Sequence, residues 1–146
     1  MAATGDRNDP YASFNFLVSI DGVGTVAGFA EVSGLTTETA IIEYRTGDET
    51  NTVRKLPGLR KYTNIALKRG YTTDKALWTW RQTVINGKTQ RQSGAITLRD
   101  EAGNAALRWN FKEGWPSKWE GPSFNAKSND VAIESMEIAV EDIELE

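Results

Sequence analysis

Hydrophobic and polar residues alternate along much of this chain with the period of two that is typical of half-buried β-strands. The alternation is clearest from Phe14 to Ile20, after which Asp21-Gly22 predicts a turn. Similar patterns predict strands at 28–33, 64–69 and 131–140, and a longer strand rich in β-branched residues at 36–45. The chain is therefore predicted to be rich in β-structure.

Two further stretches of the chain have the signals of hairpins. The polar stretch 46–59 contains Pro57-Gly58, a turn signal, and is predicted to form an extended loop or a protruding hairpin. From 95 to 111, two strand-like runs flank a short Gly-containing segment. In that second hairpin, the residues expected to meet across the strands are Ile96 and Leu98 on one side and Leu107, Trp109 and Phe111 on the other.

The last predicted strand changes its pattern part-way along. Val131 and Ile133 occupy odd positions, whereas Met136, Ile138 and Val140 occupy even ones. A β-bulge adds one residue to a strand and moves the following side chains to the other face. We therefore expect this strand to change its buried face near Ser135.

A single segment, 75–86, has the spacing of an amphipathic helix. Apolar residues recur at helical intervals, Asn86-Gly87 predicts its end, and Asp74 is expected as its N-cap or first-turn acid. The predicted apolar stripe consists of Leu77, Trp80 and Val84, widened by Trp78 and Ile85. With one helix and seven or eight strands, the predicted fold is a mainly β sandwich or barrel with a flanking helix, in a single domain over 1–146.

Composition excludes several classes of function. The chain has 146 residues, of which 39% are hydrophobic and 25% charged, and it contains neither His nor Cys. It therefore lacks disulfides, thiolate metal sites and the commonest general base. We expect synthesis in the cytoplasm, without a signal peptide or membrane insertion, because no apolar run has the necessary length.

None of the candidate chemical motifs has the required spacing. Gly22, Gly24 and Gly28 are not followed by a helix that could hold a phosphate, and Ser33 lacks the nucleophile-elbow pattern. The C-terminal acids lack the spacing of a calcium loop. We therefore predict no enzymatic activity, no cofactor and no metal.

Charge is distributed unevenly along the chain. Residues 45–69 contain seven bases and two acids, a local charge of +5, whereas 130–146 contains seven acids and no base, a local charge of −7. Two solvated faces would explain these segments. Alternatively, opposite patches on identical subunits would steer head-to-tail association.

Tryptophan is unusually frequent, with five residues in the chain. Trp78 and Trp80 lie on the predicted helix, and Trp115 and Trp119 on a predicted W-P-x-x-W loop. Exposed tryptophans on a β protein would favour a monomeric carbohydrate-binding module that stacks sugars on indole rings. Burial in a core or in a subunit interface is the other interpretation of these side chains.

Nine segments, taken in order, resemble the tube-protein family of contractile phage tails, R-type bacteriocins and extracellular contractile injection systems. The segments are D-P-Y (9–11), F-N-F-L-V-S-I-D-G (14–22), F-A-E-V-S-G-L (29–35), I-E-Y-R-T-G-D-E (42–49), K-L-P-G-L (55–59), I-A-L-K-R-G (65–70), A-L-W-T-W (76–80), W-N-F-K-E-G-W-P-S-K-W-E-G (109–121) and F-N-A-K-S-N-D-V-A-I-E-S-M-E-I-A (124–139). No single motif is specific, but their ordered succession covers almost the whole chain.

The resemblance implies a self-assembling structural subunit whose fold is shared with the tube subunit of type VI secretion. Six copies would close a ring, and rings would stack into a hollow tube inside a contractile sheath. The implied partners are other copies of the chain, the sheath protein, a baseplate and spike hub, a tube terminator or cap, and DNA or protein cargo in the lumen. The implied location is a phage tail or a phage-tail-like particle that can be released from the cell.

The polar loop from Glu43 to Leu59, whose second half is basic, is the predicted stacking element of such a tube, because it is long enough to reach an adjacent ring and could meet an acidic surface there. The residues predicted to form contacts between rings or subunits are Tyr11, Glu43, Tyr44, Arg45, Asp48, Glu49, Arg54, Lys55 and Leu56. The exterior of the helix is predicted to face the sheath through Lys75, Arg81 and Gln82.

Overall fold

A computed structural model describes residues 10–12, 15–26, 29–48, 51–71, 73–127, 129 and 131–146. The described chain forms ten strands and one helix. In chain order they are β1 (Phe16–Ile20), β2 (Gly24–Val26), β3 (Phe29–Ser33), β4 (Thr37–Tyr44), β5 (Arg54–Tyr62), β6 (Ile65–Gly70), α1 (Ala76–Ile85), β7 (Gln92–Arg99), β8 (Ala105–Glu120), β9 (Ile133–Ala139) and β10 (Asp142–Leu145). The predicted mainly β class with one helix is therefore confirmed, with more strands than the pattern indicated.

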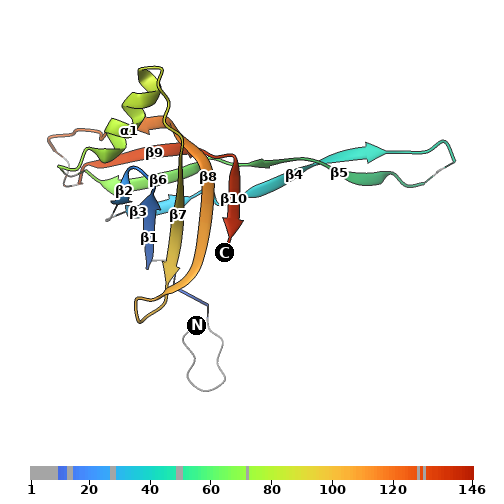
Figure 1. Cartoon of the computed structure of the whole chain (residues 1–146), viewed down its shortest axis with the longest axis horizontal. Helices are drawn as coiled ribbons and strands as arrows, with labels where there is room; N and C mark the ends of the chain where they lie inside the picture. The colour runs from blue at the N-terminus through green and yellow to red at the C-terminus, as the bar shows by residue number, and fades with distance from the viewer. Residues whose placement is uncertain are drawn as a thin grey trace.

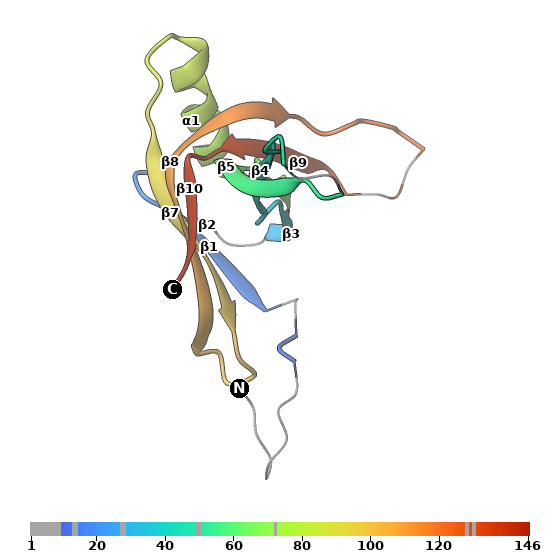
Figure 2. The ribbon, with the colours of Figure 1, turned by 90° about the vertical axis from the view of Figure 1, so that its right-hand side faces the viewer.

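Eight of these strands form one strongly bent sheet. Its order is β2-β1-β7-β8-β9-β6-β3, with β10 paired to β8, and every pair is antiparallel. Figures 1 and 2 show that β1 and β7 run across the direction of β9 and β6, so the sheet folds over into two layers. Strand β8 joins the layers, because its first half pairs with β7 and β10 and its second half with β9.

The bend of β8 coincides with a β-bulge. Gln92 is opposite Gly114 and Gly94 is opposite Phe111, so two residues of β8 face one residue of β7. Within the bulge, Glu113 has a φ of 55°, the left-handed conformation in which a bulged strand turns sharply. The bulge thus lets one strand serve both layers.

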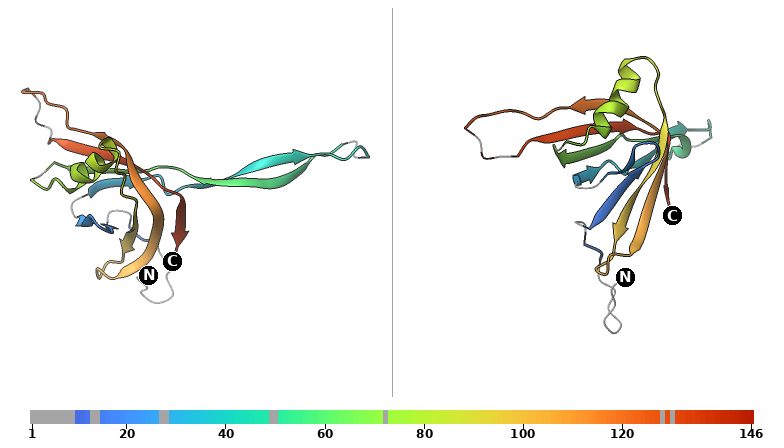
Figure 3. Two further views of the ribbon diagram at one scale, coloured as in Figure 1. Left: turned by 45° about the horizontal axis from the view of Figure 1, so that its top comes forward. Right: turned by 60° about the vertical axis from the view of Figure 1, so that its left-hand side comes forward.

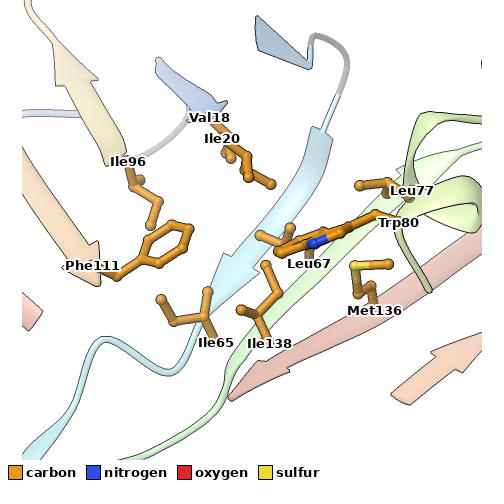
Figure 4. Packing of buried hydrophobic residues seen from close by; sticks show 10 residues of the cluster. All are labelled: Val18, Ile20, Ile65, Leu67, Leu77, Trp80, Ile96, Phe111, Met136 and Ile138. Carbon is orange, nitrogen blue, oxygen red and sulfur yellow. The ribbon is translucent and has the colours of Figure 1, made fainter. Parts of the chain in front are cut away.

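The core lies between the two layers (Figure 4). Its buried members come from β1, β6, α1, β7, β8 and β9, and they are Val18, Ile20, Ile65, Leu67, Leu77, Trp80, Ile96, Phe111, Met136 and Ile138. Ile96 is opposite Trp109 and Leu98 is opposite Leu107, which confirms the predicted pairing of the second hairpin. Among the described residues no helix is long and apolar enough to cross a membrane.

Two glycines make room for the ring of Phe111 at the centre of this core. A Cβ at Gly94 would lie 2.5 Å from Cζ of Phe111 and 2.6 Å from the carbonyl oxygen of Ser19. A Cβ at Gly114 would lie 2.7 Å from Cε1 of the same ring. The aromatic ring therefore fills the space that both missing side chains leave.

Substitution Gly94→Ala is expected to destabilise the subunit by about 3 kcal/mol, because the added methyl group overlaps both a backbone oxygen and the buried ring. Denaturant unfolding measures the loss. Gly47→Ala is the matched control, since a Cβ there meets no atom within 4 Å. Equal midpoints for the two variants would contradict this account of the core.

Helix α1 packs against β8 and buries Leu77 and Trp80. The indole N–H of Trp80 donates a hydrogen bond of 2.8 Å to the carbonyl of Gln90. Ile85 was expected to widen the buried stripe, but it is 57% exposed because it is the last residue of the helix. Asp74 precedes the N-cap residue Lys75, although its carboxylate still accepts the N–H of Ala76 at 3.0 Å.

Three local expectations are wrong. Pro57-Gly58 is not a turn but part of β5, where a register shift opposite Ala40 accommodates it on a ribbon of only two strands. The W-P-x-x-W segment is not a loop but the second half of β8. Strand β9 contains no bulge, since its pairing with β6 is uninterrupted, and the extra residue is Ser117 of β8.

The reason for the last error is a buried carboxylate. Val131 and Ile133 are exposed, whereas Glu134 shares the buried face with Met136 and Ile138. Apolar residues alone would place Val131 and Ile133 on the core face of this strand. The even-numbered positions are buried along the whole strand, and an acidic side chain occupies one of them.

Candidate assembly surfaces

The ribbon formed by β4 and β5 projects far from the two-layered body (Figure 1). We call these two strands, with the described residues 45–48 and 51–53 between them, the hairpin arm. It continues the ladder of β3 and β6, whose last pair is Ser33 with Ala66, into a first pair of Thr37 with Tyr62. Eight residues of strand at about 3.3 Å each give the arm a length of about 26 Å.

Short hydrogen bonds fix the base of the hairpin arm to the body. The N–H of Thr36 donates to the carbonyl of Gly34 at 2.8 Å, and the N–H of Thr63 donates to the carbonyl of Thr36 at 3.2 Å. The hydroxyl of Thr63 also donates to the carbonyl of Gly34 at 2.9 Å. Gly34 has a φ of 93°, which suits glycine, and the Asn64 carbonyl leaves no room for a Cβ.

The hairpin arm exposes large apolar side chains on a two-stranded ribbon that has no layer to cover it. Every residue of β4 is exposed. The exposed large apolar residues of the arm are Ile41, Ile42, Tyr44, Val53, Leu56 and Leu59, the last at 86%. An isolated hairpin is marginal in water, and exposed apolar patches mark contact surfaces. The arm therefore has the properties of a surface that another chain covers.

The structure brings most of the predicted contact residues together on this arm. Seven of them lie on β4, on β5 or in the turn between the strands: Glu43, Tyr44, Arg45, Asp48, Arg54, Lys55 and Leu56. Glu49 lies outside the described residues. Tyr11 precedes β1, is half-buried, and is not part of the arm. Sequence reasoning missed Ile41, Ile42, Val53 and Leu59, although adjacent isoleucines on a ribbon must point to opposite faces.

The acidic C-terminal segment is largely neutralised within the chain. Glu137 lies 3.9 Å from Lys118, Glu144 lies 3.6 Å from Lys112, and Glu146 lies 3.5 Å from Arg108. At the base of the hairpin arm, Arg60 shares a hollow of about 540 Å³ with Glu141, Asp142 and Glu144. Three C-terminal acids are thus paired with bases of β8, and Arg60 of the basic segment lies near three acids of the same subunit.

A buried ionic network joins the two segments most closely. Arg69 and Glu134, both about 3% exposed, form an ion pair through Nε and Oε1. The indole N–H of Trp119 donates to the other Glu134 oxygen at 3.2 Å. Arg69 also contacts Asp74, through the carboxylate at 3.2 Å and the carbonyl at 3.0 Å. Strands β6, β8 and β9 and the start of α1 are held together at this point.

The chain matches a family model. Residues 12–144 match the model described as T4-like virus tail tube protein gp19. The chain belongs to the T4-like tail tube protein family. Because this match covers nearly the whole chain, it confirms the family resemblance found in the sequence. It also confirms the predicted structural, non-enzymatic role.

Solved structures support the same assignment of this tail tube protein. A chain from the PVC sheath-tube complex of an extracellular contractile injection system has 28% identity and a TM-score of 0.85, over 94% of this chain and 91% of that chain. A chain from the tube-terminating cap of the anti-feeding prophage has 29% identity and a TM-score of 0.84, over 99% and 95%. No curated protein sequence matches significantly.

The predicted likeness to type VI secretion tube subunits is confirmed at the level of the fold. Hcp1 from Flavobacterium johnsoniae has 16% identity and a TM-score of 0.61, over 90% of this chain and 94% of that chain. The residues predicted to mediate contacts of the tail tube protein stay predictions, since none of these likenesses tests them.

The tryptophans of the tail tube protein do not form an exposed platform. Trp80 is buried, and the other four are half-buried. The rings of Trp78 and Trp119 pack against each other with centroids 4.7 Å apart. The alternative of a carbohydrate-binding module therefore lacks the surface that it needs, and these side chains serve packing.

The helix surface predicted to face the sheath is only partly free. Lys75 and Gln82 are exposed. Arg81 is half-buried, and its guanidinium donates a hydrogen bond of 2.9 Å to the carbonyl of Pro116.

Among the described residues no group of acidic side chains is arranged to hold a metal ion.

Asp74 makes the stability of the tail tube protein depend on pH. The N–H of Ala76 and then the guanidinium of Arg69 hold the pKa of Asp74 below its ordinary value. Because the pKa of Asp74 is lower in the folded state than in the unfolded state, its ionised carboxylate stabilises the fold above about pH 4. This stabilisation is lost as the pH falls through the folded-state pKa. Asp74→Asn is therefore expected to lower the unfolding free energy near pH 7, and to lower it by less as the pH falls toward the lowered folded-state pKa of Asp74. Denaturant unfolding at several pH values measures this, and a constant difference would contradict it.

Proposed function

We propose that this tail tube protein closes with identical copies into six-membered rings, which stack into a hollow tube inside a contractile sheath. The observation that carries the proposal is the hairpin arm, which exposes six large apolar side chains on a ribbon that its own body cannot cover. A neighbouring subunit would bury these side chains when rings stack. The lumen of the tube would carry DNA or protein cargo.

Open sheet edges support the closing of rings. Among the described residues, the eight-stranded sheet ends at β2 on one side and at β3 on the other, so each of these strands has an edge that no described strand pairs with. Unpaired edges of this kind are templates for pairing with another chain. Lateral contacts through these edges would satisfy the backbone groups around a ring.

Negative-stain microscopy of the purified protein tests the proposal. Rings or tubes with a central channel are the expected result. Small particles of uniform size, even at high protein concentration, would overturn it. Sixfold symmetry in averaged end views tests the proposed number of subunits separately.

The proposed partners follow from the assemblies in which similar chains occur. A sheath protein would surround the tube, a baseplate and spike hub would lie at one end, and a terminator or cap at the other. The subunit, a single domain over 1–146, would be made in the bacterial cytoplasm and would leave the cell only as part of a phage tail or phage-tail-like particle.

The helix exterior is the proposed contact with the sheath. Lys75→Glu combined with Gln82→Glu is expected to give tubes of normal length that no longer recruit sheath, because both side chains are exposed and change charge. Co-sedimentation of tubes with purified sheath protein measures recruitment. Arg81 is left unchanged because it also bonds to β8. Normal recruitment by the double variant would count against the contact.

A further inference from the structure

The chain contains a single Asn-Gly dipeptide, Asn86-Gly87, at the end of α1. In such a dipeptide the backbone nitrogen of glycine can attack the side-chain amide carbon of asparagine, because glycine has no side chain that would hinder the approach. Both residues are exposed. The right-hand view of Figure 3 shows the end of α1 at the top of the molecule, where the chain turns back toward β7. The dipeptide is therefore open to water.

Two backbone hydrogen bonds hold the dipeptide in the turn that ends the helix. The N–H of Gly87 donates to the carbonyl of Val84 at 3.0 Å, and the N–H of Lys88 donates to the carbonyl of Thr83 at 2.8 Å. Together they form a Schellman motif, in which Gly87 has the left-handed φ of 76°. The nitrogen that would attack is thus engaged as a hydrogen-bond donor.

The backbone of Asn86 also keeps the two reacting atoms apart. An attack on Cγ of Asn86 requires the nitrogen of Gly87 to lie nearly eclipsed with Cβ about the Cα–C bond. Because ψ of Asn86 is 4°, the Gly87 nitrogen is instead eclipsed with the backbone nitrogen of Asn86. The closed turn is therefore unreactive. It has to open first, and helix ends open at a much lower free energy than the core.

Thr83 fastens the connection between α1 and β7 to the last turn of the helix. Its carbonyl accepts the N–H of Lys88, and its hydroxyl accepts the N–H of Gln90 at 3.4 Å. The same hydroxyl donates to the carbonyl of Trp80 at 2.7 Å, and the indole N–H of Trp80 donates to the carbonyl of Gln90. Opening of the turn around Asn86 therefore strains the contacts of Thr83.

We propose that Asn86 is a site of spontaneous deamidation and that the Schellman motif sets its rate. When the turn opens, the nitrogen of Gly87 forms a bond to Cγ of Asn86 and loses its proton. The bond from Cγ to the side-chain nitrogen breaks, and ammonia leaves. One water molecule then opens the cyclic imide at either of its two carbonyl carbons. The product is aspartate or isoaspartate at position 86, and no other reactant is needed.

Both products weaken the end of the helix. A carboxylate at position 86 lies beside the last carbonyls of α1, where the helix dipole makes a negative charge unfavourable. Isoaspartate also adds one methylene group to the main chain, so the bonds of Gly87 and Lys88 cannot keep their geometry. We expect the connection from α1 to β7 to loosen in either form, and more in the isoaspartate form.

Peptide mapping by mass spectrometry tests the site. The purified, folded chain is incubated at mildly alkaline pH, which favours the deprotonated nitrogen of Gly87. Conversion is expected at Asn86, to both aspartate and isoaspartate, and faster than at Asn104, which is also exposed but precedes alanine. Asn86→Gln is expected to stay unmodified at this position, because ring closure from the longer side chain is much slower. Conversion at Asn86 that is no faster than at Asn104 would overturn the site.

Two substitutions of Thr83 test the control by the turn. Thr83→Val removes the hydroxyl at nearly constant size and is expected to raise the rate of conversion at Asn86 about fivefold, the change that loss of one ordinary hydrogen bond makes in an opening equilibrium. Thr83→Ser keeps the hydroxyl and is expected to react at the wild-type rate. Circular dichroism checks that both variants are folded. Equal rates in Thr83→Val and the wild type would overturn the role of the turn. Both experiments use the subunit whether or not it assembles, so their outcomes are independent of the proposed function.

Discussion

Reversing the charges of Arg54 and Lys55 to glutamate is expected to leave a folded subunit that no longer forms tubes. Both residues are exposed on β5 of the hairpin arm, far from the buried core. Lys55 is opposite Glu43, so the reversal places two acids side by side in the ribbon that we propose as the stacking element. Like charges placed next to each other in an interface cost about several kcal/mol, and this repulsion would be repeated at each subunit of a stacked ring.

The expected magnitude is a rise of at least about 100-fold in the critical concentration for assembly. Sedimentation and negative-stain microscopy measure it. The double variant Lys88→Glu with Arg91→Glu makes the same change of charge at exposed positions after α1 and is expected to assemble normally. Normal tubes from the arm variant, at wild-type protein concentrations, would refute its role in stacking.

Removing one partner of the buried ion pair is expected to have the largest effect on stability. In the wild type the Glu134 side chain is about 3% exposed, and Arg69→Leu removes its counter-charge. Of the contacts to this carboxylate within the described residues, the hydrogen bond from the indole N–H of Trp119 remains. An uncompensated buried charge costs about 3–5 kcal/mol. That loss is a large fraction of the about 5–15 kcal/mol by which domains are stable. Denaturant unfolding measures this loss of stability. The substitution is made in the Arg54→Glu, Lys55→Glu variant, so that polymerisation does not interfere.

The double variant Arg69→Leu with Glu134→Leu distinguishes pairing from simple packing. Replacing both charges with apolar groups removes the desolvation cost, so we expect the double variant to recover most of the stability lost in the single variant. If the stability losses of the single variants Arg69→Leu and Glu134→Leu simply add in the double variant, the two residues do not act as a pair. Asp74 would lose its contacts to Arg69 in both variants, so its contribution cancels in this comparison.

The sequence determined the local elements of this protein. Alternation predicted β1, β3, β4 and β6, and helical spacing predicted α1, each within a few residues of its observed bounds. The Asp21-Gly22 dipeptide also predicted a turn after β1. In the structure Gly22 has a φ of 75°, a conformation that favours glycine. These features depend on interactions between residues that are near each other in the chain.

Tertiary structure decided which side chains are buried and where the assembly surface lies. Glu134 occupies a core position because Arg69, sixty-five residues earlier in the chain, supplies its counter-charge across the sheet. Ile41 and Ile42 look like core residues in the sequence, yet they are exposed because the ladder of β3 and β6 carries them beyond the body. Burial depends on what lies opposite a residue in space, and local periodicity contains no information about that neighbour.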